Sequence, residues 1–201
     1  METGTKSTFI TNLEKQIGEF NFRACQAIEQ GEMEQAYSQL QHIMTVFSTV
    51  DMSRHKLPLS LQKSRAHLLT NTGVVAARLK RFPQSRQAFG QARLLFENLG
   101  DTEQVAMQSG NLGSVCRDTG DFEQAIKCYE HAATLLNESS GDEILLADQW
   151  SNLAFSYAQL KDHTRATDFF ERALAVYRRA GNTDKAQLAE SNIANLKSQL
   201  S

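Results

Sequence analysis

Hydrophobic residues return at steps of three and four along nearly the whole chain. This spacing places apolar side chains on one face of an α-helix, whereas a half-buried strand would alternate at every second residue. Only Pro58 and Pro83 interrupt the 201 residues. The pattern therefore predicts an all-α protein of about nine helices, over residues 7–30, 32–50, 56–80, 83–98, 102–119, 121–138, 142–160, 162–180 and 183–200.

The same unit of small and bulky residues recurs every 40 or 41 positions. Its clearest copy has Asn-Leu-Gly at 111–113, Gly-Asp-Phe at 120–122, and then Ala125, Tyr129 and Ala132. The same spacings return without gaps 41 residues later and 40 residues earlier. Self-similarity at such a period is the signature of a stacked helical-repeat protein.

Two partial copies flank the three strong ones. Residues 191–194 (Ser-Asn-Ile-Ala) echo residues 151–154 (Ser-Asn-Leu-Ala), and a weak copy precedes the strong units. We therefore predict one domain over residues 1–201. Its parts are a weak repeat at 17–50, repeats at 66–99, 106–139 and 147–180, and a capping helix at 183–200.

Small residues on the first helix of each unit face bulky residues on the second. Two helices of a hairpin approach closely only where one offers a small residue to a large one on its neighbour. The predicted pairs are Gly73 with Phe89, Gly113 with Tyr129, and Ala154 with Phe170.

Glycine followed by a capping residue separates successive units, at 100–101, 141–142 and 181–182. A glycine can close one helix in a left-handed conformation, and Asp or Asn can cap the next helix. These pairs predict the helix boundaries between repeats.

The spacing resembles that of the tetratricopeptide repeat family, over about residues 17–200. The family's usual period is about 34 residues. The longer period here is similar to that of spindle-orientation adaptors, kinesin light chains and bacterial Rap-type regulators. The resemblance implies a right-handed superhelical solenoid of antiparallel helix hairpins. It also implies a concave groove, lined by the first helices, that binds partner peptides.

One asparagine occupies the same position in each repeat: Asn71, Asn111, Asn152 and Asn192. A side-chain amide can pair with both the N–H and the C=O of another chain's backbone. Neighbouring first helices lie roughly 9 Å apart, and an extended chain rises about 3.3 Å per residue. Successive asparagines could therefore hold a strand-like peptide at about every third residue. Alternatively, each asparagine bonds to the neighbouring repeat and sets the stacking.

The other residues predicted to contact a peptide follow from their helical offset to these asparagines. They are His67, Arg78, Ser114, Arg117, Asp148 and Phe155. Chaperone-cofactor members of the family clamp a terminal carboxylate with asparagines and cations on a following first helix. Met107 and Asp148 stand at the equivalent places here, so we do not expect recognition of a peptide C-terminus in that manner.

The net charge is −2, from 21 basic and 23 acidic residues. A nucleic-acid partner is therefore not expected, because phosphate contacts need a basic excess. No apolar run reaches the roughly 18 to 20 residues of a membrane span, and no signal-peptide pattern opens the chain, so we expect a cytoplasmic protein without membrane insertion. Three cysteines without a CxxC pair favour free buried thiols in a reducing compartment.

Scattered histidines and the lack of any catalytic or metal-binding motif predict no enzyme, no cofactor and no metal site. The predicted function is a non-catalytic module that binds a partner protein or peptide in the groove. A self-assembling scaffold and a secretion-type chaperone are the alternatives. The polar residues of the last predicted helix favour a solvating cap over filament growth, and hence a monomer or weak dimer.

Overall fold

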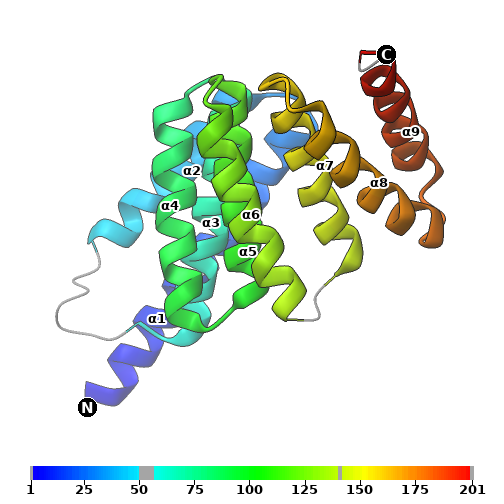
Figure 1. The fold of residues 1–201 in the computed structure, drawn as a ribbon. Helices are drawn as coiled ribbons and strands as arrows, with labels where there is room; N and C mark the ends of the chain where they lie inside the picture. Colours follow the sequence, from blue (N-terminus) through cyan, green and yellow to red (C-terminus); the bar gives the residue numbers. More distant parts are fainter. Residues whose placement is uncertain (1, 50–56, 140–141, 200–201) are drawn as a thin grey trace. The chain divides into compact units, whose positions relative to one another are not determined.

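The computed structural model describes residues 2–49, 57–139 and 142–199. Within these ranges every regular element is an α-helix, which confirms the predicted all-α class. The helices are α1 (Glu2–Glu29), α2 (Met33–Thr49), α3 (Leu59–Arg78), α4 (Phe82–Leu99), α5 (Thr102–Asp118), α6 (Phe122–Glu138), α7 (Glu143–Gln159), α8 (His163–Arg179) and α9 (Thr183–Ser198) (Figure 1).

Two predicted helix starts differ from the structure. Helix α1 begins at Glu2, earlier than the predicted residue 7, because its first turn lacks the apolar periodicity that marks a helix in sequence. Helix α3 begins at Leu59, later than predicted, since Pro58 disfavours helical geometry in the residue before it. Residues 50, 56, 141 and 200, which the sequence also placed in helices or a turn, lie outside the described residues.

Asp and Asn residues cap the helices as predicted. The predicted cap Asp142 accepts a hydrogen bond from the Ile144 N–H at 2.7 Å. The predicted cap Asp101 accepts one from the backbone N–H three residues on, at 3.2 Å, and so does Asp121, which the sequence did not predict as a cap. Asn182 does the same at the start of α9, at 3.3 Å. Gly100 and Gly181 have φ of +70°, which closes the preceding helix in the left-handed conformation.

The helices divide into two compact units, which we describe separately: the N-terminal unit, Met1–Leu95, and the C-terminal unit, Phe96–Ser201. In the N-terminal unit, α2 packs against both α1 and α3. Ala36, Leu40 and Ile43 of α2 are fully or almost fully buried, and so is Ala24 of α1. The weak repeat therefore has a true hairpin core.

Hairpin packing in both units depends on the predicted small-against-bulky pairs. A Cβ atom placed on Gly73 would lie 2.5 Å from Phe89 Cε1 in the N-terminal unit, and one on Gly113 would lie 2.7 Å from Tyr129 Cε1 in the C-terminal unit. Ala154 and Phe170 share one buried cluster. These contacts confirm the sequence interpretation, since no side chain larger than hydrogen fits at the two glycines without displacing an aromatic ring.

The cysteines are all free, and they differ in burial. Cys116 is buried in the core of the C-terminal unit, as predicted. Cys25 and Cys128 are half-buried, so the prediction of buried thiols is wrong for these two.

Candidate functional site

The first helices of the C-terminal unit, α5, α7 and α9, contribute to one pocket of about 270 Å³. We call it the first-helix pocket. Two side chains of the second helix α8 complete its wall. The lining residues are Arg117, Asp148, Ser151, Asn152, Phe155, Phe170, Tyr177, Lys185, Leu188, Ala189 and Asn192.

Half of the predicted peptide-binding residues meet at this pocket. Arg117 comes from the last turn of α5, and Asn192 comes from α9. Asp148, Asn152 and Phe155 lie on α7, at steps of four and three, and therefore share one helix face. The repeat spacing therefore predicted several of the side chains that lie together at this pocket.

The other two asparagines lie elsewhere. Asn111 of α5 is half-buried, and its amide donates to Gln108 Oε1 of the same helix at 3.4 Å. Asn71 belongs to the N-terminal unit, where its amide donates to Asn21 Oδ1 of α1 at 3.5 Å.

Two of the asparagines make the inter-repeat bonds expected for a role in stacking. Besides the bond between Asn71 and Asn21, Arg117 of α5 donates to Asn152 Oδ1 of α7 at 3.3 Å. Asn152 keeps part of its surface exposed, and its Nδ2 donates no hydrogen bond to any residue that the structure describes. A stacking bond and contact with a ligand are therefore compatible at this residue.

A polar network joins α7, α8 and α9 at one wall of the pocket. Tyr177 O–H donates to Asp148 Oδ1 at 2.7 Å, and Lys185 Nζ donates to both carboxylate oxygens of Asp148 at 2.6 and 2.8 Å. Ser151 Oγ lies 3.1 Å from the Tyr177 hydroxyl. The network holds the start of α9 against the hairpin and fixes the Asp148 side chain.

The charges in the pocket are balanced pairwise. Arg117 forms an ion pair with Asp118 at 2.9 Å, and Lys185 pairs with Asp148. Beside these pairs, Phe155 is 42% exposed and Leu188 is 63% exposed. The surface thus offers amides, hydroxyls and apolar groups together, without an excess of either charge.

The remaining predicted site residues do not line the pocket. Ser114 Oγ accepts a hydrogen bond from Tyr129 O–H at 3.2 Å and thus supports the aromatic ring in the core of its hairpin. His67 and Arg78 are exposed on α3 in the N-terminal unit.

Sequence reasoning missed Lys185, Tyr177 and Leu188 as pocket residues. Lys185 is one of the polar residues of the last helix that we expected to form a solvating cap, and its repeat counterpart, Leu145, is apolar and gives no signal of a pocket residue. Its long stem lets the ammonium reach across to α7, which residue spacing does not reveal.

Burial raises the pKa of Tyr129, Tyr157 and Tyr177 above the ordinary value of 10.0. For Tyr177, the bond with Ser151 opposes this rise and the bond to Asp148 adds to it. The unfolded chain releases these protons near pH 10, whereas the folded chain retains them. We therefore expect the free energy of unfolding to be unaffected by these groups below about pH 10 and to fall as pH rises further. Urea unfolding at stepwise alkaline pH measures this slope, and Tyr177→Phe should reduce it. An unchanged slope in that variant would contradict the assignment.

Among the described residues, no cluster of three or more His, Cys, Asp or Glu side chains could hold a metal ion. No helix in the described ranges is long and apolar enough to cross a membrane.

Comparison with known proteins gives a family and a fold. Two family models, both described as tetratricopeptide repeat, match residues 64–138 and residues 146–180, which together are more than half of the chain. No curated protein matches the sequence significantly.

Several solved structures share the fold at low sequence identity. The apo form of RapI has a TM-score of 0.79 at 15% identity; the match covers 100% of this chain and 55% of RapI, so this chain spans about half of that protein. BtubC (BKLC) from P. vanneervenii has a TM-score of 0.64 at 17% identity, covering 95% of this chain and 90% of that one. A signal transduction ATPase with a tetratricopeptide repeat sensor, PH0952 from Pyrococcus horikoshii, has a TM-score of 0.76 at 16% identity, covering 88% and 26%.

Proposed function

Because this chain belongs to the tetratricopeptide repeat family, whose members are in general interaction modules, we propose that it binds an extended segment of a partner protein at the first-helix pocket. The observation that supports this proposal most directly is the convergence of Asn152 and Asn192 on one pocket, beside exposed apolar side chains. The proposed role is binding without catalysis.

The chemistry of the pocket suits a peptide main chain. The amides of Asn152 and Asn192 supply both donors and acceptors, which an extended backbone presents at regular intervals. Adjacent first helices are separated by roughly 9 Å, close to three residues of extended chain. Asn152 and Asn192 can therefore hold peptide groups about three residues apart.

The apolar part of the pocket suits one side chain of that peptide. Phe155 and Leu188 flank it and Ala189 is buried in its wall. The whole pocket has a volume of about 270 Å³, which lies below the range of roughly 300–1,000 Å³ that is typical of pockets for drug-sized ligands and cofactors. We infer that the partner inserts a single apolar residue, with main-chain contacts on either side.

The balance of charges in the pocket indicates which net charge the partner segment should have. Both cations of the pocket already have carboxylate partners, in Asp118 and Asp148. A strongly acidic or basic ligand would gain little Coulomb energy there. The proposed partner segment is therefore close to neutral at the residues that enter the pocket.

Selection of peptides from a displayed random library on the full chain, followed by fluorescence anisotropy, tests the proposal. We expect the selected peptides to share one apolar position with few charges nearby. Replacing Asn152 or Asn192 by alanine should raise the Kd about three- to tenfold each, since a net hydrogen bond is worth about 0.5–1.5 kcal/mol. The melting temperature should stay nearly constant for Asn192→Ala, because this side chain is partly exposed. For Asn152→Ala it should fall slightly, since this variant also loses the bond from Arg117, worth about 0.5–1.5 kcal/mol.

Asn195→Ala is the matched control. Asn195 lies on the same helix, α9, is exposed, and does not line the pocket. Its replacement should leave the Kd unchanged. Equal effects at Asn192 and Asn195, or selected peptides that bind both asparagine variants as well as the original chain, would refute a main-chain role for the amides.

A further inference from the structure

Neighbouring first helices of the C-terminal unit meet along two seams, and the repeat places equivalent residues in both. In the α5–α7 seam, Gln149 of α7 lies against Gly110 of α5: a Cβ atom on Gly110 would be 2.6 Å from Gln149 Oε1. Shifts of 41 and 40 residues relate Gly110 to Ser151 of α7 and Gln149 to Ala189 of α9. The α7–α9 seam therefore has an alanine where the α5–α7 seam has a glutamine.

The glutamine fills the α5–α7 seam. Gln149 is 9% exposed, and its side-chain amide donates to the backbone oxygen of Leu145 on its own helix at 3.4 Å. Its Oε1 is buried and accepts no hydrogen bond from any residue that the structure describes. Because a buried oxygen without a partner is unfavourable, this side chain contributes to the seam mainly through the volume that it occupies beside Gly110.

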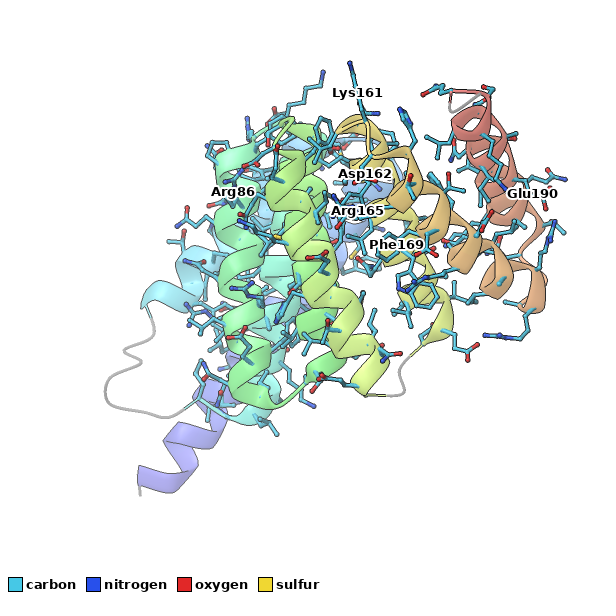
Figure 2. The ribbon with its side chains drawn as sticks, in the orientation of Figure 1. Arg86, Lys161, Asp162, Arg165, Phe169 and Glu190 are labelled. Carbon is cyan, nitrogen blue, oxygen red and sulfur yellow. The ribbon has the colours of Figure 1, made fainter. Side chains whose placement is uncertain are left out.

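The alanine leaves the α7–α9 seam open. Ser151 and Ala189 both line the first-helix pocket, and the side chain of Ala189 ends at Cβ, whereas a glutamine would extend into the pocket. Figure 2 shows Glu190, the residue after Ala189, on α9. Glu190 pairs with Arg178 of α8 at 2.7 Å and does not line the pocket. The first-helix pocket thus lies at the position that Gln149 occupies one repeat earlier.

Building on the proposed function, we propose that the residue at this seam position decides which two first helices hold the partner's apolar residue. Ala189 admits that residue between α7 and α9, and Gln149 excludes it between α5 and α7. The partner's apolar residue then lies between the amides of Asn152 and Asn192, and not between those of Asn111 and Asn152. The two seam residues therefore set the register of the bound segment.

Ala189→Gln closes the pocket in the manner of Gln149. This variant of the full chain should raise the Kd of the tightest peptide from the displayed library at least about tenfold, since the apolar residue of the peptide would stay in water. Ala194→Gln is the matched control, because it makes the same substitution on the same helix at an exposed position that does not line the pocket. Its Kd should equal that of the original chain. Fluorescence anisotropy measures both values, and circular dichroism verifies the fold.

Gln149→Ala opens the α5–α7 seam and tests the register from the other side. In the double variant with Ala189→Gln, the peptide should bind again, moved by one repeat. Its Kd should then rise when Asn111 is replaced by alanine and stay unchanged when Asn192 is replaced, which reverses the dependence expected of the original chain.

One measurement needs no peptide. Gly110→Ala places a Cβ atom against Gln149, so it should raise the urea midpoint less in the original chain than in the Gln149→Ala variant, where the seam has space. Equal shifts in the two backgrounds would show that Gln149 does not fill the seam and would overturn the inference. If no library peptide bound the original chain, the proposed function would fail, and the role of the seam residues in peptide register would fail with it, although the coupling between Gly110 and Gln149 would remain.

Two binding results would overturn the inference while leaving the proposed function intact. The first is a folded Ala189→Gln variant that binds the peptide as tightly as Ala194→Gln does. The second is a double variant, Gln149→Ala with Ala189→Gln, in which binding is not restored or still depends on Asn192.

Discussion

Replacing Tyr129 by alanine is expected to lower the free energy of unfolding by about 3–5 kcal/mol, the usual cost of removing a buried aromatic side chain. Tyr129 is 0% exposed, and its ring lies directly against the backbone of Gly113. Removing the ring leaves a cavity in the buried cluster that Tyr129 shares with Cys116 and Ala125. Urea denaturation followed by circular dichroism measures the change.

Tyr129→Phe is the control for this variant. It keeps the ring and removes only the hydroxyl, which donates to Ser114 Oγ at 3.2 Å. The expected loss is about 1 kcal/mol, the net contribution of one hydrogen bond. If the alanine and phenylalanine variants were equally stable, the ring would not be the element that joins the hairpin.

Gly113→Ala is expected to destabilise the chain by about 1–3 kcal/mol, although alanine is the better helix former by about 1 kcal/mol. The added Cβ atom would lie 2.7 Å from Tyr129 Cε1 and 2.8 Å from Cδ1, so the buried ring or the helix would have to shift. Overpacking therefore outweighs helix propensity at this position. The same urea titration gives the sign of the change.

Two further variants separate overpacking from any other cost of the alanine. In the Tyr129→Ala background the ring is gone, so Gly113→Ala should become neutral or stabilising. Gly90→Ala, in a helix position where an added Cβ would meet nothing within 4 Å, should stabilise by up to about 1 kcal/mol. A Gly113→Ala cost that persists without the ring would show that the small residue is not required by its aromatic neighbour.

The hairpin contacts could be predicted because they follow from local spacing. Within one unit of 40 or 41 residues, the positions of Gly113 and Tyr129 fix which helix faces meet, and a glycine opposite an aromatic residue has a steric explanation. The caps at Asp101, Asp142 and Asn182 were predictable for a similar reason, because a capping side chain bonds to the backbone only a few residues away.

Contacts between repeats were harder to predict, because they depend on how closely successive first helices approach. A Cβ atom on Gly110 of α5 would lie 2.6 Å from Gln149 Oε1 of α7, a contact that the residue pattern did not suggest. Gln108, also on α5, is 0% exposed, and its side-chain oxygen accepts from Asn111. The side-chain amide of Asn111, which the repeat pattern predicted to face the groove, therefore bonds to a buried glutamine of its own helix.

The pocket itself was predictable in part. The equivalent asparagines on α7 and α9 and the offsets from them identified Asn152, Asn192, Phe155 and Asp148. Lys185 was not recognised, because the position of its ammonium group is set by a long flexible stem and by Asp148 on another helix. A contact between a long side chain and a residue of another helix depends on the folded structure, so it leaves no periodic signal in the sequence.

The most direct test of the account is nuclear magnetic resonance of the side-chain amides. A chain labelled with ¹⁵N would be titrated with the tightest peptide from the displayed library, with the Asn152→Ala and Asn192→Ala variants used to assign the signals. We expect the Nδ2 signals of Asn152 and Asn192 to shift along one saturation curve while that of Asn195 stays in place. Saturation of the chain with both groove amides unmoved would contradict the proposal that the first-helix pocket holds the partner's main chain.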